Sequence, residues 1–153
     1  MSLVANRRSV MTLFSAPDCP DSHRARIVIA EKDITADIVQ IDRTQMSEDL
    51  TDDWYSLIYQ FDEADKKQQA QLRKRLRESL LTSAPLFMEA RPYLLGEEFS
   101  LVDCSVIPVL WRLGHYGIQL PPAAAAITGY ANSMFERPAV RNSLSEAERD
   151  MHV

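Results

Sequence analysis

A helix-capping sequence stands directly before the most apolar segment of the chain. Ser100 and Asp103 have the spacing of a capping box, in which each side chain accepts a hydrogen bond from the backbone amide of the other residue. Residues 104–111 are apolar on nearly every side, which is typical of a helix inside a core. Because a buried helix cannot leave its first amides unpaired, the sequence predicts a central helix that begins at Ser100 and is kinked at Pro108.

The first 50 residues have a different pattern. Short β-favouring runs at residues 10–14 and 36–41 predict two strands. Between them, residues 22–32 predict an amphipathic helix capped by Asp21 or Ser22. We therefore expect a βαβ unit with parallel strands and a right-handed crossover. The apolar positions of its helix are Ala25, Val28 and Ile29, and the charged positions are Arg24, Arg26, Glu31 and Lys32.

Every segment after residue 52 has a helical pattern. Leu72, Leu76 and Leu80, spaced by four, mark the buried side of a helix at 63–81. The predicted fold is therefore an α/β domain, residues 1–50, followed by an all-helical domain, residues 51–153. Further helices are predicted at 53–59, 86–88, 93–95 (ended by Gly96), 123–135 and 145–151, the last capped by Ser145 or by Ser143.

The composition excludes several functional classes. The net charge of −5 argues against direct nucleic-acid binding. No apolar stretch approaches the roughly 18 residues of a membrane span, and no secretory signal is recognised. The four glycines provide no nucleotide-binding loop, and the three histidines lie far from other ligands, so we expect no metal site and no cofactor. With no disulfide framework either, a cytoplasmic location is expected.

One basic cluster allows two interpretations. Arg73, Lys74, Arg75 and Arg77 fall within the helix predicted at 63–81. Such a run is usually the solvated face of a helix. The alternative is a docking patch for an acidic partner, with Arg73, Lys74 and Arg77 as its contacts.

The order of these elements resembles the glutathione-transferase fold, with a thioredoxin-like N-terminal domain. In that family the central helix follows Tyr-Leu-x-Gly, an acidic residue and Phe-Ser-x-x-Asp. Residues 93–103 match this motif. A closer resemblance is to the stringent starvation protein A family of bacteria. It covers residues 8–15, 22–23, 26–32, 53–55, 99–104, 110–113, 135–137 and 146–149.

The resemblance implies a function and also exposes a departure. It implies a homodimeric transcription regulator that binds RNA polymerase holoenzyme during starvation or stress and has no transferase activity. Members of the family, however, have two more strands and a helix where this chain runs from Leu50 to Asp53, so roughly 50–60 residues are absent. The absent part would hold glutathione in true transferases and would carry the polymerase-contact loop of the regulators. Either the sequence omits a stretch, which we favour, or a deletion leaves a sheet edge for a partner to cover.

Two cysteines receive different predictions. Cys19-Pro20 has the position of the reactive thiol in glutaredoxins and omega-type transferases, and the positive end of the following helix would favour a thiolate. The neighbours Asp18 and Asp21 oppose it, and the alternative is an exposed loop cysteine. Cys104 is predicted to be a core residue. Core positions are also predicted for Trp54, Tyr55 and Trp111, whereas Ser22 is predicted to be a helix cap and not a nucleophile.

Three hypotheses remain. The first is the non-enzymatic, polymerase-binding regulator. The second is a glutathione-dependent thiol transferase or reductase that uses Cys19. The third is a structural subunit that completes a mixed dimer. Thiol reactivity separates the second from the first, and the oligomeric state of the purified chain tests the third.

Overall fold

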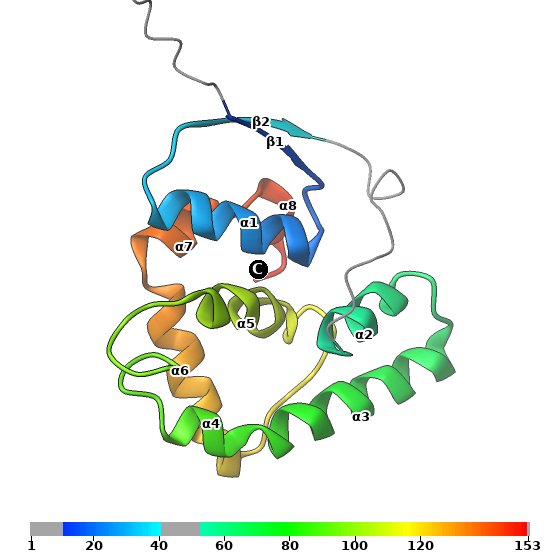
Figure 1. Cartoon of the computed structure of the whole chain (residues 1–153). Coiled ribbons are helices and arrows are strands. Elements are labelled where there is room, and N and C mark those ends of the chain that lie inside the picture. The colour runs from blue at the N-terminus through cyan, green and yellow to red at the C-terminus, as the bar shows by residue number, and fades with distance from the viewer. Residues whose placement is uncertain (1–10, 41–52, 153) are drawn as a thin grey trace, which may run out of the picture.

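The structure of the chain, a computed structural model, describes residues 11–40 and 53–152. Two strands lie at one end of the molecule with α1 beneath them, and the remaining helices surround α5 (Figure 1). The elements are β1 (Met11–Ser15), α1 (Pro20–Glu31), β2 (Ala36–Gln40), α2 (Asp53–Phe61), α3 (Lys66–Thr82), α4 (Ala84–Met88), α5 (Leu101–Arg112), the 3-10 helix η2 (Pro122–Ala124), α6 (Ala125–Phe135), α7 (Pro138–Ser143) and α8 (Glu146–Asp150).

The two strands and α1 form the predicted βαβ unit. β1 and β2 are parallel, with Met11 paired to Ala36 and Ser15 to Gln40. The exposed fractions of Ile38 and Val39 on β2 are 50% and 42%, so this strand presents apolar side chains to solvent. The predicted domain boundary at residues 50–51 lies outside the described residues.

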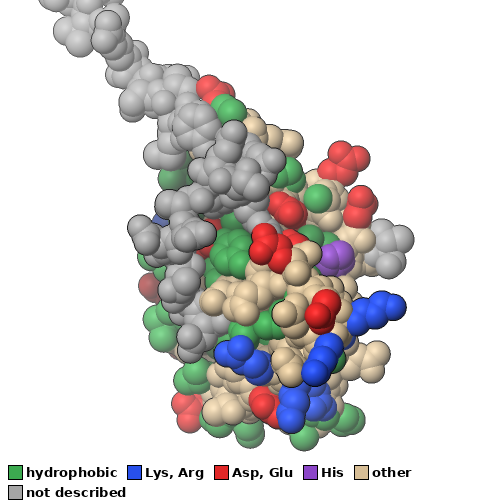
Figure 2. All heavy atoms as spheres, turned by 90° about the vertical axis from the view of Figure 1, so that its right-hand side faces the viewer, with side chains coloured by type: hydrophobic (Ala, Val, Ile, Leu, Met, Phe, Trp, Pro, Cys, Tyr) green, Lys and Arg blue, Asp and Glu red, His purple; other side chains and the backbone are tan. Residues whose placement is uncertain are grey.

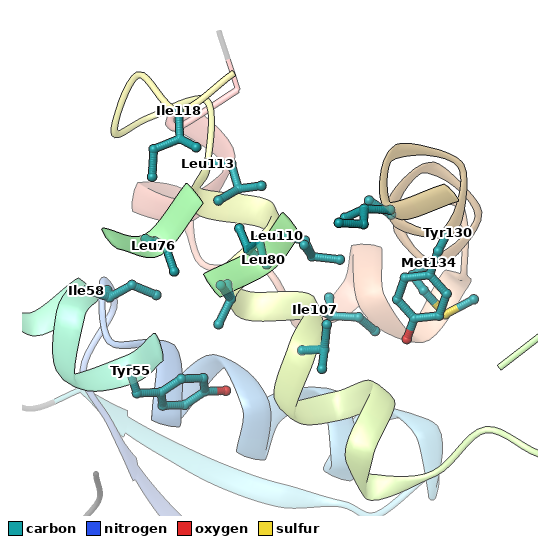
Figure 3. Close-up of a cluster of buried hydrophobic side chains, with 14 of the residues drawn as sticks. Tyr55, Ile58, Leu76, Leu80, Ile107, Leu110, Leu113, Ile118, Tyr130 and Met134 are labelled. Atoms are coloured by element: carbon teal, nitrogen blue, oxygen red, sulfur yellow. The ribbon is translucent and has the colours of Figure 1, made fainter. Parts of the chain in front are cut away.

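The main hydrophobic core lies between α5 and the helices around it (Figure 3). Ile107 and Leu110 of α5 are buried, which confirms the predicted central helix. The predicted side of α3 also faces this core, with Leu72, Leu76 and Leu80 buried. Figure 3 also labels Tyr55 and Ile58 of α2, Tyr130 and Met134 of α6, and Leu113 and Ile118.

Two segments of the helical domain differ from the prediction, one because a predicted helix is wrong and one because a helix was not predicted. Residues 93–95 are not helical, because Tyr93 and Gly96 exchange backbone hydrogen bonds of 3.0 and 3.1 Å. Gly96 has φ +125°, a backbone conformation that residues other than glycine rarely adopt, so a glycine at this position allows the turn. The chain also forms α7, a helix that the sequence analysis does not predict.

The first helix differs most from its prediction. Its N-cap residue is Cys19, without a side-chain capping bond, so the predicted caps Asp21 and Ser22 are wrong. Pro20 explains the shift, because proline at the first helical position needs no partner for an N–H and already has a helical φ. The Ser22 hydroxyl instead accepts a hydrogen bond of 3.0 Å from the Ala16 amide at the end of β1.

Candidate functional site

The buried face of α1 is polar. Asp21, Ser22, His23 and Arg26 are all buried, whereas the sequence pattern predicts that the charged positions face solvent. Burying a charge is unfavourable unless the charge is paired. The polar face of α1 is therefore the starting point for a candidate site.

A single carboxylate pairs with two buried guanidinium groups. Glu148 of α8 is fully buried, and Arg26 Nη2 donates to both of its oxygens at 2.6 Å. Arg112 Nη2, from the end of α5, donates to Glu148 Oε1 at 2.9 Å. The Ser145 amide donates to Glu148 Oε2 at 2.9 Å within the capping box of α8. These donors satisfy the carboxylate, and they join the first and last helices through the central one.

His23 completes this cluster in its neutral form. Its Nδ1 lies 3.1 Å from Arg112 Nη1 and 3.7 Å from Glu148 Oε1. A guanidinium only donates, so Nδ1 accepts and the ring proton resides on Nε2. Burial, with further contributions from Arg112 and Arg26, lowers the pKa of His23 well below its usual value. Among the described residues, His23 Nε2 and Arg112 Nε have no hydrogen-bond partner.

The same arginines hold the loop between β1 and α1. Arg26 Nη1 donates to the Ser15 hydroxyl, and Arg112 Nη2 donates to the Asp18 carbonyl at 3.1 Å. The Ser145 hydroxyl donates to the Pro17 carbonyl. The conformation of the loop that leads into Cys19 therefore depends on residues from both ends of the chain.

Cys19 is fully buried at the end of this loop, so the prediction of an exposed loop cysteine is wrong. Its sulfur lies 3.2 Å from the Tyr59 hydroxyl, which donates its proton to Asp21 Oδ2. Burial, aided by hydrogen bonds to Asp21 and Cys19, raises the pKa of Tyr59 far above its ordinary value. Because the Tyr59 proton is committed to Asp21, the thiol donates to the Tyr59 oxygen. The candidate redox thiol is thus a protected hydrogen-bond donor in this structure.

The second cysteine and the predicted core aromatics lie in the core. Cys104 is buried, and burial, followed by the charges of Asp103 and Glu31, raises the pKa of its thiol to about 11. Tyr55 and Trp111 are buried as predicted, and Trp54 is partly buried against the core.

The capping box at the start of α5 is a structural site. Ser100 is the N-cap residue of α5. Its amide donates to Asp103 Oδ2 at 2.9 Å, and its hydroxyl donates to the same oxygen at 3.1 Å. Asp103 Oδ1 accepts from the Leu94 amide at 3.1 Å and from the Tyr130 hydroxyl at 2.5 Å. Burial and the bond to Asp103 raise the pKa of Tyr130, which keeps it a donor.

The basic cluster on α3 is partly occupied by contacts within the chain. Basic side chains gather on the lower part of the face shown in Figure 2. Arg73 Nε donates to the Tyr116 carbonyl at 2.7 Å, and Arg77 Nε donates to the Gln119 carbonyl at 3.0 Å. Lys74 is exposed and lies 3.9 Å from Glu78. Arg73 and Arg77 therefore tether a loop, and Lys74 and Arg75 form the freely presented part of the predicted patch.

Two surface hollows adjoin this cluster and lie away from the charge network. One, of about 410 Å³, is lined by residues of α2 and α3 that include Gln60, Gln68 and Arg75. The other, of about 300 Å³, is lined by residues that include Asp62, Arg73 and His115. Within residues 11–40 and 53–152, no group of three potential metal ligands is found and no helix could cross a membrane.

The sequence predicts no functional role for Arg26, Arg112, His23 or Glu148. Two signals for them exist in the sequence. Arg112 follows an apolar helix directly, and Glu148 has the N3 position relative to the predicted cap Ser145. Neither signal identifies its partner, because the residues are up to 122 positions apart in the chain.

Comparison with known proteins identifies two domain types. The model of the glutathione S-transferase C-terminal domain matches residues 35–138, and the model of the glutathione S-transferase N-terminal domain matches residues 9–60. The two matches overlap at residues 35–60. The predicted combination of a thioredoxin-like N-terminal unit and a helical transferase-type domain is confirmed.

Curated relatives are similar along the whole chain. The stringent starvation protein A homolog of Coxiella burnetii is 29% identical over 202 aligned positions, covering 95% of this chain and 96% of the relative. That of Haemophilus influenzae is 28% identical, covering 96% of each. Because 202 positions are aligned to a chain of 153 residues, at least 49 positions have no counterpart here. This confirms the predicted absence of a long stretch relative to these proteins.

Solved structures confirm the fold. Gtt2 from Saccharomyces cerevisiae has a TM-score of 0.65 and 16% identity, covering 88% of this chain and 100% of that one. A glutathione S-transferase from the Antarctic clam Laternula elliptica has a TM-score of 0.67 and 13% identity, covering 93% and 95%.

Proposed function

This chain belongs to the glutathione S-transferase family, and from that premise we propose that it is a non-enzymatic transcription regulator that binds RNA polymerase during starvation or stress. The observation that carries the proposal is the similarity to stringent starvation protein A homologs over nearly the full length of both chains. A shared fold alone would not distinguish a regulator from a transferase.

The environment of Cys19 supports a non-enzymatic role. A nucleophilic thiol has to be accessible and to ionise readily. Cys19 is fully buried and donates its proton to Tyr59, whose own proton is held by Asp21.

A binding experiment tests the proposal directly. The tagged protein is expressed from the complete coding sequence across residues 50–53, so that any stretch omitted there is included, and is incubated with purified bacterial RNA polymerase holoenzyme. The mixture is analysed by size-exclusion chromatography. We expect co-elution, and a transferase-active family member serves as the control that does not co-elute. Failure of the chain to bind the holoenzyme, or to recover polymerase subunits from extract, contradicts the proposal.

The candidate contact patch can be tested in the same experiment. Lys74 is exposed and pairs only across one turn of its own helix, with Glu78 at 3.9 Å among the described residues, so Lys74→Glu should weaken polymerase binding while leaving the fold intact. The matched control is Lys67→Glu, an exposed residue in the first turn of the same helix. Equal binding by the two variants would remove this patch from the proposal. Arg73 and Arg77 are less suitable, since their replacement also releases the loop that they tether.

Assembly and location belong to the same proposal. We propose a cytoplasmic homodimer, as the family resemblance implies. Light scattering of the purified chain measures its mass in solution. A monomer that dimerises only with a second protein would instead support the mixed-dimer hypothesis.

A glutathione-dependent thiol transferase remains the second candidate. The observation in its favour is that Cys19 is the N-cap residue of a helix of 12 residues, where the helix dipole favours a thiolate. Alkylation of native protein by iodoacetamide across pH 6–9 distinguishes the two functions. Rapid modification of Cys19 near pH 7 would favour the transferase, whereas protection up to alkaline pH would exclude it.

A further inference from the structure

The C-terminal helix α8 is attached to the molecule by very few side chains. It has five residues, which is far too short for a helix that is stable by itself. Glu148 is its one buried residue. The neighbouring contacts of this segment are the Ser145 hydroxyl on Pro17 and the Trp111 indole, which donates to the Glu148 carbonyl at 2.8 Å. His152 stacks on Trp111 with ring centroids 3.7 Å apart, and its Nε2 lies 2.7 Å from the Trp111 carbonyl oxygen. Glu148 is thus the charged anchor of α8, and His152 holds the end of the segment.

The groups around that carboxylate belong to the rest of the protein. Arg26 and His23 lie on α1, and Arg112 lies on α5 (Figure 1). All three are buried, and two permanent positive charges face one negative charge. Without Glu148, two guanidinium groups would remain in the interior unpaired, a strongly unfavourable arrangement. A neutral His23 adds no further charge.

The unpaired nitrogens add a second observation. His23 Nε2 and Arg112 Nε are buried and have no hydrogen-bond partner among the described residues. Both atoms belong to side chains of the cluster, so not all of its donors are used by acceptors of the described chain. Two buried guanidinium groups that converge on one point favour an anion there, and Arg26 Nη2, which donates to both oxygens of Glu148, fits the paired oxygens of a carboxylate.

We propose that Arg26 and Arg112 form a carboxylate-binding pocket between α1 and α5, with His23 accepting from Arg112 and so positioning it, and that the C-terminal segment 144–152 is the intramolecular ligand of this pocket through Glu148. The segment acts as a latch. When it is seated, the pocket also holds the β1–α1 loop through Ser15 and Asp18, and Cys19 is covered. This inference does not depend on polymerase binding.

Chemical rescue tests the pocket in the full chain. Glu148→Ala removes one methylene group and the carboxylate, which together have the size of acetate. We expect the variant to melt roughly 10 °C below the parent protein, because it leaves two buried charges unpaired. Acetate at about 100 mM should then raise its Tm by about 3 °C, since a ligand that binds only the folded state stabilises it. The exposed residue Glu146 on the same helix provides the matched control, Glu146→Ala.

The outcomes are distinguished by the choice of solute. Acetamide has the shape of acetate without its charge, and sodium chloride matches the ionic strength. Rescue of Glu148→Ala by acetate alone, with the parent protein and Glu146→Ala unaffected, supports the pocket. Equal effects of acetate and acetamide, or of acetate and chloride, overturn it.

A folding failure does not leave the proposal untested. If Glu148→Ala does not fold in dilute buffer, it is refolded from urea in acetate, acetamide or chloride and followed by circular dichroism. Recovery of helical signal in acetate alone supports the pocket, and recovery in none or in all three contradicts it. Labelling of Cys19 in a Cys104→Ser background, with Glu148→Gln, tests the latch. We expect labelling at least about tenfold faster than in the parent, and an unchanged rate contradicts the latch.

Discussion

Helices α5 and α8 begin with the same local motif and bury it in different surroundings. Each has a serine at the N-cap, Ser100 or Ser145, and a fully buried acidic residue three positions later, Asp103 or Glu148. The Asp103 carboxylate accepts hydrogen bonds from backbone amides and hydroxyl groups. The Glu148 carboxylate accepts from two guanidinium groups as well as from its capping amide.

The difference shows what each box does for the fold. The partners of Asp103 come from α5, from the preceding turn and from α6, so this box orders one part of the helical domain. The partners of Glu148 come from α1 and α5, so the second box connects the two ends of the chain. Removing one uncharged donor of Asp103 removes one hydrogen bond, whereas removing Glu148 leaves two buried guanidinium groups without their counter-charge.

The largest effect is expected from Glu148→Gln. The amide keeps the size of the side chain but removes the negative charge between Arg26 and Arg112. We expect the free energy of unfolding to fall by about 3–5 kcal/mol, as for other broken buried ion pairs. Urea denaturation measures the change. A loss no larger than that of the Asp103→Ala variant described next would contradict the expected difference between the two boxes.

Removing the carboxylate of the capping box at α5 should lower the free energy of unfolding by less. Asp103→Ala leaves the Leu94 amide and the Tyr130 hydroxyl without their acceptor inside the protein. We expect a loss of about 2–3 kcal/mol by urea denaturation. Tyr130→Phe, which removes one donor and no charge, is the milder companion variant. If it destabilises as much as Asp103→Ala, the comparison fails.

The pH dependence of stability should depend on the cluster around Glu148, because that cluster contains His23 and the capping box of α5 contains no histidine. The pKa of His23 is lowered in the folded state, so the unfolded chain binds a proton more readily. Stability is therefore complete above the unfolded value of about 6.5 and decreases as the pH falls below it, by up to about 1.4 kcal/mol per pH unit until the folded pKa is reached. His23→Asn, which retains an acceptor at the Nδ1 position, should flatten this slope between pH 7 and 5.

A control histidine completes that measurement. His115 is exposed, so His115→Asn should leave the slope of the parent protein unchanged. Parallel slopes for all three proteins would contradict the assignment of acid sensitivity to the charged cluster.

The smallest losses of stability are expected from removal of the Ser100 hydroxyl in the capping box of α5 and from removal of the exposed cap of α3. Asp65 and Gln68 form a capping box at the exposed start of α3. We expect Ser100→Ala to reduce stability by about 1–2 kcal/mol and Asp65→Ala by about 0.5–1 kcal/mol, since water can replace the lost bonds only at the exposed helix. Thermal unfolding of the two variants decides whether burial strengthens a cap.

The predicted parts of the fold share one property, which is that their signals are local. The capping box at Ser100 and Asp103 and the leucines of α3 are read from residues three or four positions apart. The failures occur where distant residues decide the outcome. Arg26 is interpreted as a solvent-facing charge because its partner Glu148 lies 122 residues away. Cys19 is interpreted as reactive or exposed because the contact with Tyr59 comes from another helix.

The sequence by itself determined the βαβ start, the buried central helix, its capping box and the family resemblance. These follow from hydrophobic periodicity and from hydrogen bonds between near neighbours in the chain. Only the tertiary structure decided that the box at Ser100 and Asp103 is tied to Leu94 and Tyr130, and that the matching box at α8 is a charged connection to the first helix. The physical reason is that burial makes an unpaired charge intolerable without specifying its partner, so the partner is known only once distant segments are packed together.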